Sequence, residues 1–199
     1  NITKFLFSTI FIFMSLNVAV FLGSKVGNDT KNIKVVKEFS KWFCSQKYNL
    51  IFGGTETGLM LELVKNVFKK NLQIISIFNK SLYDEYPNSR YFSELIITKD
   101  LSSRNELIIN KSDVFVALPG GIGTLNEIFE VISKNLLNEI DKKIYLVNDN
   151  YFWTPLEELL TSLSKKKLVD QNKLKKNFRV CKLKELKSEF KKIYAKNRS

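Results

Sequence analysis

One segment of the sequence, Leu118–Glu127, joins the end of an apolar run to the start of an amphipathic one. Pro119 lacks an N–H group and ends the apolar run, and the glycines after it leave space for a ligand beside the backbone. We expect a helix to begin at Thr124, whose hydroxyl and neighbouring N–H groups would attract an anion. The segment predicts a phosphate-binding loop, and a tight strand-to-helix turn without a ligand is the plainer interpretation.

Two charged residues could act on a ligand held by this loop. Glu127 lies one turn into the expected helix, so its carboxylate faces back toward the loop. A carboxylate beside a bound phosphate is useful where a cation forms, as in glycosidic cleavage through an oxocarbenium ion. Arg104 begins another expected helix, and its guanidinium could hold a phosphate or stabilise charge. The plainer interpretations are a glutamate stabilised by the helix dipole and a surface arginine.

Short apolar runs alternate with amphipathic segments along the chain, which predicts a parallel sheet covered by helices. Strands are expected at Asn17–Leu22, Asn49–Phe52, Ile74–Phe78, Leu95–Thr98, Val114–Leu118 and, as the last clear strand, Lys143–Val147. Helices are expected at Ile33–Gln46, Gly58–Lys70, Arg104–Lys111, Thr124–Leu137 and Pro155–Lys166. Asn79–Ser93 shows no periodicity and is expected to be a flexible loop near the site. The fold class is therefore α/β, a Rossmann-like open parallel sheet with helices on both faces.

Glycines follow three of the expected strands at their carboxyl ends. These are Gly23, the pair Gly53-Gly54, and the glycines after Pro119. In an open α/β sheet the carboxyl ends of the strands line the ligand crevice. We therefore expect the three turns to meet in a single site.

The composition limits the chemistry available to the chain. Its 199 residues include no histidine, which excludes a Ser-His-Asp triad, a Cys-His dyad and a histidine-ligated zinc site. The two cysteines, Cys44 and Cys181, lie far apart and lack metal-ligand spacing. We expect no disulfide framework and a reducing compartment, the cytoplasm.

Positive charge is concentrated near the end of the chain. The formal net charge is +12, and residues 165–199 carry 14 Lys and Arg against three acids. Such a tail can bind nucleic acid or an acidic membrane, but few aromatic residues accompany its lysines, so we expect a solvated helical tail and neither of those partners. The remaining organisation is predicted as one domain over residues 14–199. The apolar stretch 1–13 is expected to be an extension before a natural start at Met14, and a signal-peptide core or a membrane anchor is the alternative. The stretch is shorter than the roughly 20 residues that a membrane span needs.

The glycine-rich segment resembles a family signature. Pro119–Glu127 reads PGGIGTLNE and fits PGGxGTxxE, which is typical of the Lonely Guy proteins, cytokinin riboside 5′-monophosphate phosphoribohydrolases often labelled lysine decarboxylases. Looser similarities follow in the family's order over most of the chain, at Val20–Ser24, Phe52–Met60, Asp100–Asn105 and Ile140–Lys143.

This resemblance implies a homodimer that hydrolyses AMP or an N6-substituted AMP to the free base and ribose 5-phosphate, as in cytokinin activation. It implies no metal and no other cofactor. Catalytic roles are implied for Arg104 and Glu127. Substrate or phosphate contacts are implied for Gly23, Ser24, Gly53, Gly54, Met60, Asn105, Gly120, Gly121, Gly123 and Thr124.

The sequence departs from the family pattern at several positions. Thr55 and Leu61 replace glycines, Ser102 replaces a histidine, Asn105 a lysine and Asn126 a glutamate. The arginine and glutamate of the reaction are retained, so the reaction type is expected and the base preference stays open. The alternative is a non-catalytic carrier of a phosphate-bearing ligand, similar to the molybdenum-cofactor carrier proteins, which would not need both charged residues.

Overall fold

A parallel sheet forms the centre of the molecule. The computed structural model describes residues 15–196, so the predicted extension 1–13 and its boundary at Met14 lie outside the described residues. The strands are β1 (Asn17–Phe21), β2 (Asn49–Phe52), β3 (Ile74–Asn79), β4 (Glu94–Thr98), β5 (Val114–Ala117), β6 (Ile144–Val147) and β7 (Phe178–Cys181). The helices are α1 (Lys31–Gln46), α2 (Gly58–Phe68), α3 (Lys80–Glu85), α4 (Leu101–Lys111), α5 (Ile122–Leu136), α6 (Thr154–Lys165), α7 (Gln171–Asn177) and α8 (Leu183–Lys196).

The strand order creates a crevice beside β1. The sheet runs β4-β3-β2-β1-β5-β6-β7, and every neighbouring pair is parallel. The chain moves outward from β1 to β4 and then crosses to β5 on the other side of β1. At such a switch point the loops after the two strands diverge, and a ligand crevice forms outside their carboxyl ends. The two loops touch at their base, where the N–H of Gly23 donates to the carbonyl of Pro119 at 3.0 Å.

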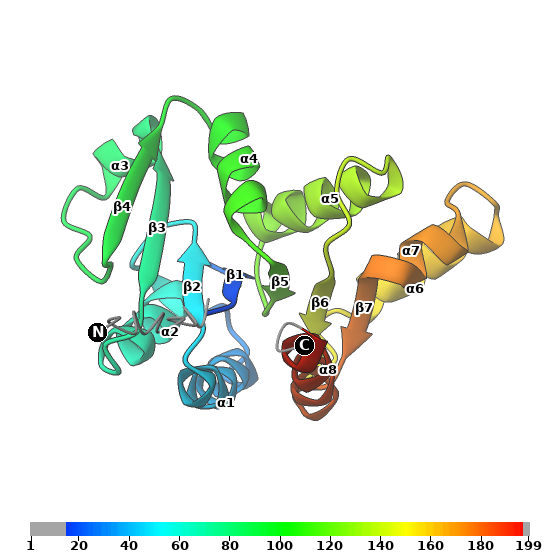
Figure 1. Ribbon diagram of the computed structural model, residues 1–199, viewed down its shortest axis with the longest axis horizontal. Helices are drawn as coiled ribbons and strands as arrows, with labels where there is room; N and C mark the ends of the chain where they lie inside the picture. The colour runs from blue at the N-terminus through cyan, green and yellow to red at the C-terminus, as the bar shows by residue number, and fades with distance from the viewer. Residues whose placement is uncertain (1–14, 197–199) are drawn as a thin grey trace, which may run out of the picture.

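Helices cover both faces of the sheet, which confirms the predicted Rossmann-like class. One core layer joins the sheet to α1, α2 and α8, and the other joins it to α4, α5, α6 and α7. Figure 1 shows α1, α2 and α8 on one side of the strands and α4 and α5 on the other. The central strands are apolar and buried on both faces, as the continuous apolar runs predicted. Within residues 15–196 no helix is long and apolar enough to cross a membrane.

The tract Asn79–Ser93 is not an irregular loop throughout, because it contains α3. Asn79 caps this helix by accepting a hydrogen bond from the N–H of Leu82 at 3.2 Å. The helix has six residues and none of them is buried, so no apolar stripe marked it in the sequence. The capping asparagine was the available signal.

The lysine-rich tail is a structural part of the domain and contains more than the solvated helix that was expected. Its residues form β7, which pairs with β6, and α8, whose Leu186 and Phe190 are buried. The ring of Phe190 packs edge-on against Trp42, with 5.2 Å between the ring centroids. The strand was missed because it spans four residues between helical segments rich in charge.

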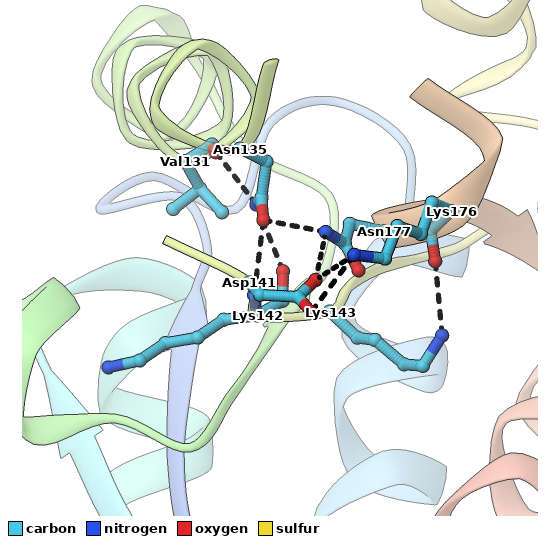
Figure 2. Close-up of polar contacts among 7 residues, drawn as sticks. All are labelled: Val131, Asn135, Asp141, Lys142, Lys143, Lys176 and Asn177. Atoms are coloured by element: carbon cyan, nitrogen blue, oxygen red, sulfur yellow. Dashed lines mark hydrogen bonds and ion pairs between the residues drawn. The ribbon is translucent and has the colours of Figure 1, made fainter. Parts of the chain in front are cut away.

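A buried amide network holds α7 against α5 (Figure 2). The Oδ1 atom of Asn135 accepts hydrogen bonds from Asn177 Nδ2 at 2.8 Å and from the N–H of Lys142 at 3.1 Å. Asn177 Nδ2 also donates to Asp141, which pairs with Lys176 at 2.9 Å. These contacts lower the pKa of Asp141 below its ordinary value. The segment Ile140–Lys143, similar to a family motif, therefore joins structural elements at the amino-terminal edge of β6, away from the switch point.

Candidate active site

A cavity of about 750 Å³ opens at the switch point beside β1. This volume lies in the range of small-molecule sites, roughly 300–1,000 Å³. Its walls come from the loops after β1, β2, β5 and β6 and from the starts of α2, α4 and α5. Among the described residues that line it, the charged side chains are Lys25, Arg104 and Glu127.

Arg104 is buried at the cavity wall and bonded in three directions. Its Nε donates to the carbonyl of Ile77 at 3.0 Å, Nη1 to Asn105 Oδ1 at 3.0 Å and Nη2 to Glu127 Oε1 at 3.1 Å. These acceptors lie on β3, α4 and α5, so three elements fix the plane of the guanidinium. A planar fork with several fixed donors suits the recognition of an anion or of a developing negative charge.

Gly53 makes this position of Arg104 possible. A Cβ atom at residue 53 would lie 1.8 Å from Arg104 Nη2, far inside van der Waals contact. The glycine after β2 therefore gives its side-chain space to the guanidinium. Gly54, the next residue, has a different constraint, because its φ is +96° and a Cβ there would meet the ring of Phe78 at 2.3 Å.

Glu127 is a buried carboxylate with one cationic partner. Its side chain is 7% exposed and pairs with Arg104 at 3.1 Å. Burial raises the pKa of Glu127 above its ordinary value, and the charge of Glu130 raises it further, while Arg104 acts in the opposite direction. In its ionised form Glu127 is a desolvated negative charge whose attraction for a cation is little screened by water.

The loop before α5 leaves a helix start open to the cavity. The helix begins at Ile122 and not at Thr124, because Gly121 takes the extended conformation of an N-cap, with φ −96° and ψ −154°. No side chain of residues 15–196 caps it. Thr124 is buried within the first turn, and a Cβ at Gly120 would meet its Oγ1 at 2.2 Å. At Gly121 and Gly123 a Cβ would meet no atom of the described part of the chain within 4 Å, so the space beside both is free for a ligand.

Two other helix starts near the cavity already donate to acceptors of the protein. The first N–H groups of α2, at Leu59 and Met60, donate to the carbonyl of Gly23 at 3.1 and 3.3 Å. At α4 the carboxylate of Asp100 accepts from the N–H of Ser103 at 2.7 Å. Of these three helix starts, α5 is the one with no side-chain cap and no such acceptor among the described residues, so it is the best placed to receive an anion.

The β1–α1 loop is held close to α2 through a glycine. Gly58 has φ +51°, and a Cβ there would lie 2.4 Å from the carbonyl oxygen of Ser24. This close approach keeps Gly23, Ser24 and Lys25 at the cavity wall. Lys25 has no ion-pair partner within residues 15–196, so its charge is available to a ligand.

Most of the residues expected to form the site line this one cavity. They are Gly23, Ser24, Gly53, Met60, Arg104, Gly120, Gly121, Gly123, Thr124 and Glu127. Gly54 and Asn105 are not among its lining residues; the first packs on Phe78 and the second lies behind Arg104.

Sequence reasoning missed several residues of the cavity wall. Lys25 directly follows Gly23-Ser24, and Phe152 belongs to the loop after β6. Both could have been found from the rule that loops at the carboxyl ends of parallel strands line the ligand crevice. Leu82 and Leu101 lie at the starts of α3 and α4, and nothing in their sequence context marks them.

The fold and the cavity define a Rossmann-like α/β protein with a ligand site at its switch point. The family model described as "Possible lysine decarboxylase" matches residues 60–189. The cytokinin riboside 5′-monophosphate phosphoribohydrolase of Rhodococcoides fascians is 30% identical over 142 residues, which cover 70% of this chain and 71% of that protein. An Arabidopsis thaliana enzyme of the same name is 32% identical over 136 residues, which cover 68% of this chain and 60% of the enzyme. The chain belongs to this family, the Lonely Guy family that its signature resembles.

Solved structures with the same fold share less sequence. The molybdenum cofactor binding protein of Rippkaea orientalis superposes with a TM-score of 0.66 at 20% identity, over 91% of this chain and 98% of that one. The molybdenum cofactor carrier protein of Chlamydomonas reinhardtii superposes with a TM-score of 0.67 at 19% identity, over 91% of this chain and 99% of that one. At these identities the likeness establishes the fold.

Proposed function

We propose that the protein hydrolyses the N-glycosidic bond of a nucleoside 5′-monophosphate, giving the free base and ribose 5-phosphate. The observation that carries the proposal is the buried Arg104–Glu127 pair in a cavity that also contains an uncapped helix start. A desolvated carboxylate close to a phosphate site suits a reaction in which the sugar becomes cationic. The names of the relatives support the same reaction class.

In the proposed mechanism the phosphate binds the first turn of α5, with Lys25 as a second cationic contact. The bond from C1′ of the ribose to the base nitrogen breaks, its electron pair leaves with the base, and C1′ becomes an oxocarbenium ion. Glu127 stabilises this ion or activates the water whose oxygen then bonds to C1′, and the water proton neutralises the base. Arg104 holds the substrate and favours the ionised form of Glu127.

The base would occupy the apolar part of the cavity wall. Leu82, Leu101, Phe152 and Met60 are apolar side chains that line the cavity and could contact the base. Apolar side chains accept a purine ring and an N6 substituent equally well, so AMP and N6-substituted AMP are both proposed substrates. The family relationship also supports a homodimer.

The test is to incubate the full chain with AMP and with N6-isopentenyl-AMP and to follow the free base by liquid chromatography. Release of base with an equal amount of ribose 5-phosphate is the expected result. If both nucleotides bind tightly and none of the common purine or pyrimidine monophosphates loses its base, the proposal is wrong and a carrier of a phosphate-bearing ligand is the better description.

The acid limb of the pH profile is expected to move when the charge of Glu130 is removed. Glu127 must be ionised to act, so kcat/KM rises as the pH increases through its pKa. Glu130 raises that pKa, and Glu130→Gln should therefore move the limb to lower pH. The substrate phosphate titrates near pH 6 with the wild type and with Glu130→Gln alike, so its effect on the two pH profiles is the same. A limb that stays in place or moves upward would contradict this assignment.

Gly121→Ala is expected to weaken phosphate binding without harming the fold. Its backbone angles are extended and allowed for alanine, and the new methyl group would meet no atom of the described residues within 4 Å. The methyl would occupy the space where the phosphate meets α5, so KM for AMP should rise about tenfold, the loss of one charge-assisted hydrogen bond. Calorimetric titration should show that the affinity for ribose 5-phosphate falls by a similar factor and that the affinity for adenine is unchanged. Equal weakening of adenine would place the phosphate elsewhere.

A further inference from the structure

A chain of hydrogen bonds runs from Arg104 away from the cavity to the surface of α5. Nη1 of Arg104 donates to Asn105 Oδ1 at 3.0 Å, and Asn105 Nδ2 donates to Glu130 Oε2 at 2.7 Å. Asn105 is 4% exposed, and Phe21 and Ile108 lie beside it. Glu130 is half-buried and lies one turn after Glu127.

The chemistry of the three groups fixes the direction of this chain. A guanidinium can only donate hydrogen bonds, and an ionised carboxylate can only accept them. The amide of Asn105 must therefore present its oxygen to Arg104 and its nitrogen to Glu130. Rotating the amide by half a turn would place a donor against the arginine and an acceptor against the carboxylate, and both bonds would be lost.

We propose that Asn105 and Glu130 are positioning residues that hold the guanidinium of Arg104 in its active orientation. The proposal rests on the proposed phosphoribohydrolase function. Glu130 orients the amide of Asn105, and the amide oxygen then supplies one of the three acceptors around Arg104. Neither residue lines the cavity, so neither is proposed to touch the substrate.

The family pattern shows why this arrangement belongs to this chain. The residue after the arginine in that pattern is a lysine, and a lysine ammonium has donors only. It could pair with Glu130 but could not accept a bond from Arg104. The replacement by Asn105 thus converts a second positive charge beside the arginine into a neutral link between the arginine and Glu130.

The first test compares turnover in matched variants. Glu130→Ala removes the acceptor, and kcat for AMP should fall about tenfold while KM changes less than about twofold, because the phosphate contacts remain. Glu130→Gln retains a carbonyl acceptor and should keep kcat within about threefold. Asn105→Leu removes both bonds and should lower kcat about ten- to hundredfold. Asn110→Leu, at an exposed position of the same helix, is the control with unchanged kcat.

A second readout does not depend on activity. In the unliganded protein the Nε–H of Arg104 is buried and bonded to Ile77, so its nitrogen-15 NMR signal should exchange slowly with solvent. Glu130→Ala should accelerate that exchange, and Glu130→Gln should restore it. If the wild-type protein releases no base, the proposed function fails and this signal still decides the positioning role.

The positioning role is wrong if Glu130→Ala leaves both kcat and the Arg104 signal as in the wild type. It is also wrong if both Glu130 variants lose turnover only in proportion to a lowered melting temperature. Should Asn105→Leu not fold, the two Glu130 variants decide the question alone, because their side chain is at the surface of α5.

Discussion

Glu127→Gln is expected to lower the rate of base release from AMP about 10³-fold, the range of effects seen on removing a catalytic acid–base group. The amide oxygen of glutamine can still accept the hydrogen bond from Arg104, so the geometry of the pair is retained and the negative charge is lost. A neutral amide cannot stabilise an oxocarbenium ion or take a proton from water. The measurement is the single-turnover rate with enzyme in excess over AMP.

Binding provides the control for this prediction. The phosphate contacts at α5 do not involve Glu127, so the affinity for AMP by calorimetric titration should change less than about threefold. The same substitution one turn later, Glu130→Gln, should leave the plateau rate nearly unchanged. Residual turnover in Glu127→Gln above about a tenth of the wild-type rate would remove Glu127 from the mechanism.

Gly53→Ala is expected to lower kcat for AMP about 10²-fold without unfolding the protein. The new Cβ would lie 1.8 Å from Arg104 Nη2, and the end of a long side chain can move where a backbone cannot. The guanidinium would leave its place between the three acceptors, and a displacement of about 1 Å in a positioned group costs roughly this factor. Steady-state kinetics and a thermal melt on the same sample measure the two effects.

The neighbouring glycine separates a local effect from a general one. Gly54→Ala requires an alanine at φ +96° and against Phe78, so it should lower the melting temperature strongly. In an Arg104→Ala background Gly53→Ala should have little further effect on the rate, because the group that it displaces is gone. Additive losses in the double variant would show that Gly53 acts on something other than Arg104.

The layers of the fold could be predicted from the sequence because each carries a local signal. Buried strands are continuous apolar runs, such as Asn49–Phe52, and the helices show a spaced apolar face. The elements that were missed lack such a signal: α3 buries no residue, and β7 has four residues among charged neighbours. The start of α5 was misplaced by two residues, because Gly123 in a first helical turn reads as part of the preceding loop.

The site could be predicted as a place but not as a set of contacts. Strand-end glycines and the PGGxGTxxE segment indicated which loops meet at the switch point, since the topology of the sheet determines where the site lies. The pairing of Arg104 with Glu127 and the link from Asn105 to Glu130 depend on how α4 and α5 lie side by side. The packing of α4 beside α5 is a long-range feature, and the residue pattern within either helix does not predict it.

The junction of β1 with β5 has a consequence for the order in which this molecule can assemble. Asn17 and Asp113, joined there by a hydrogen bond of 2.8 Å, are 96 positions apart along the chain. While the chain is being synthesised, β1 can pair with β2 long before β5 leaves the ribosome, so one edge of β1 stays open during most of that time. The cavity at the switch point forms only when β5 fills this edge, and a bound ligand would favour the completed junction over any partly folded chain.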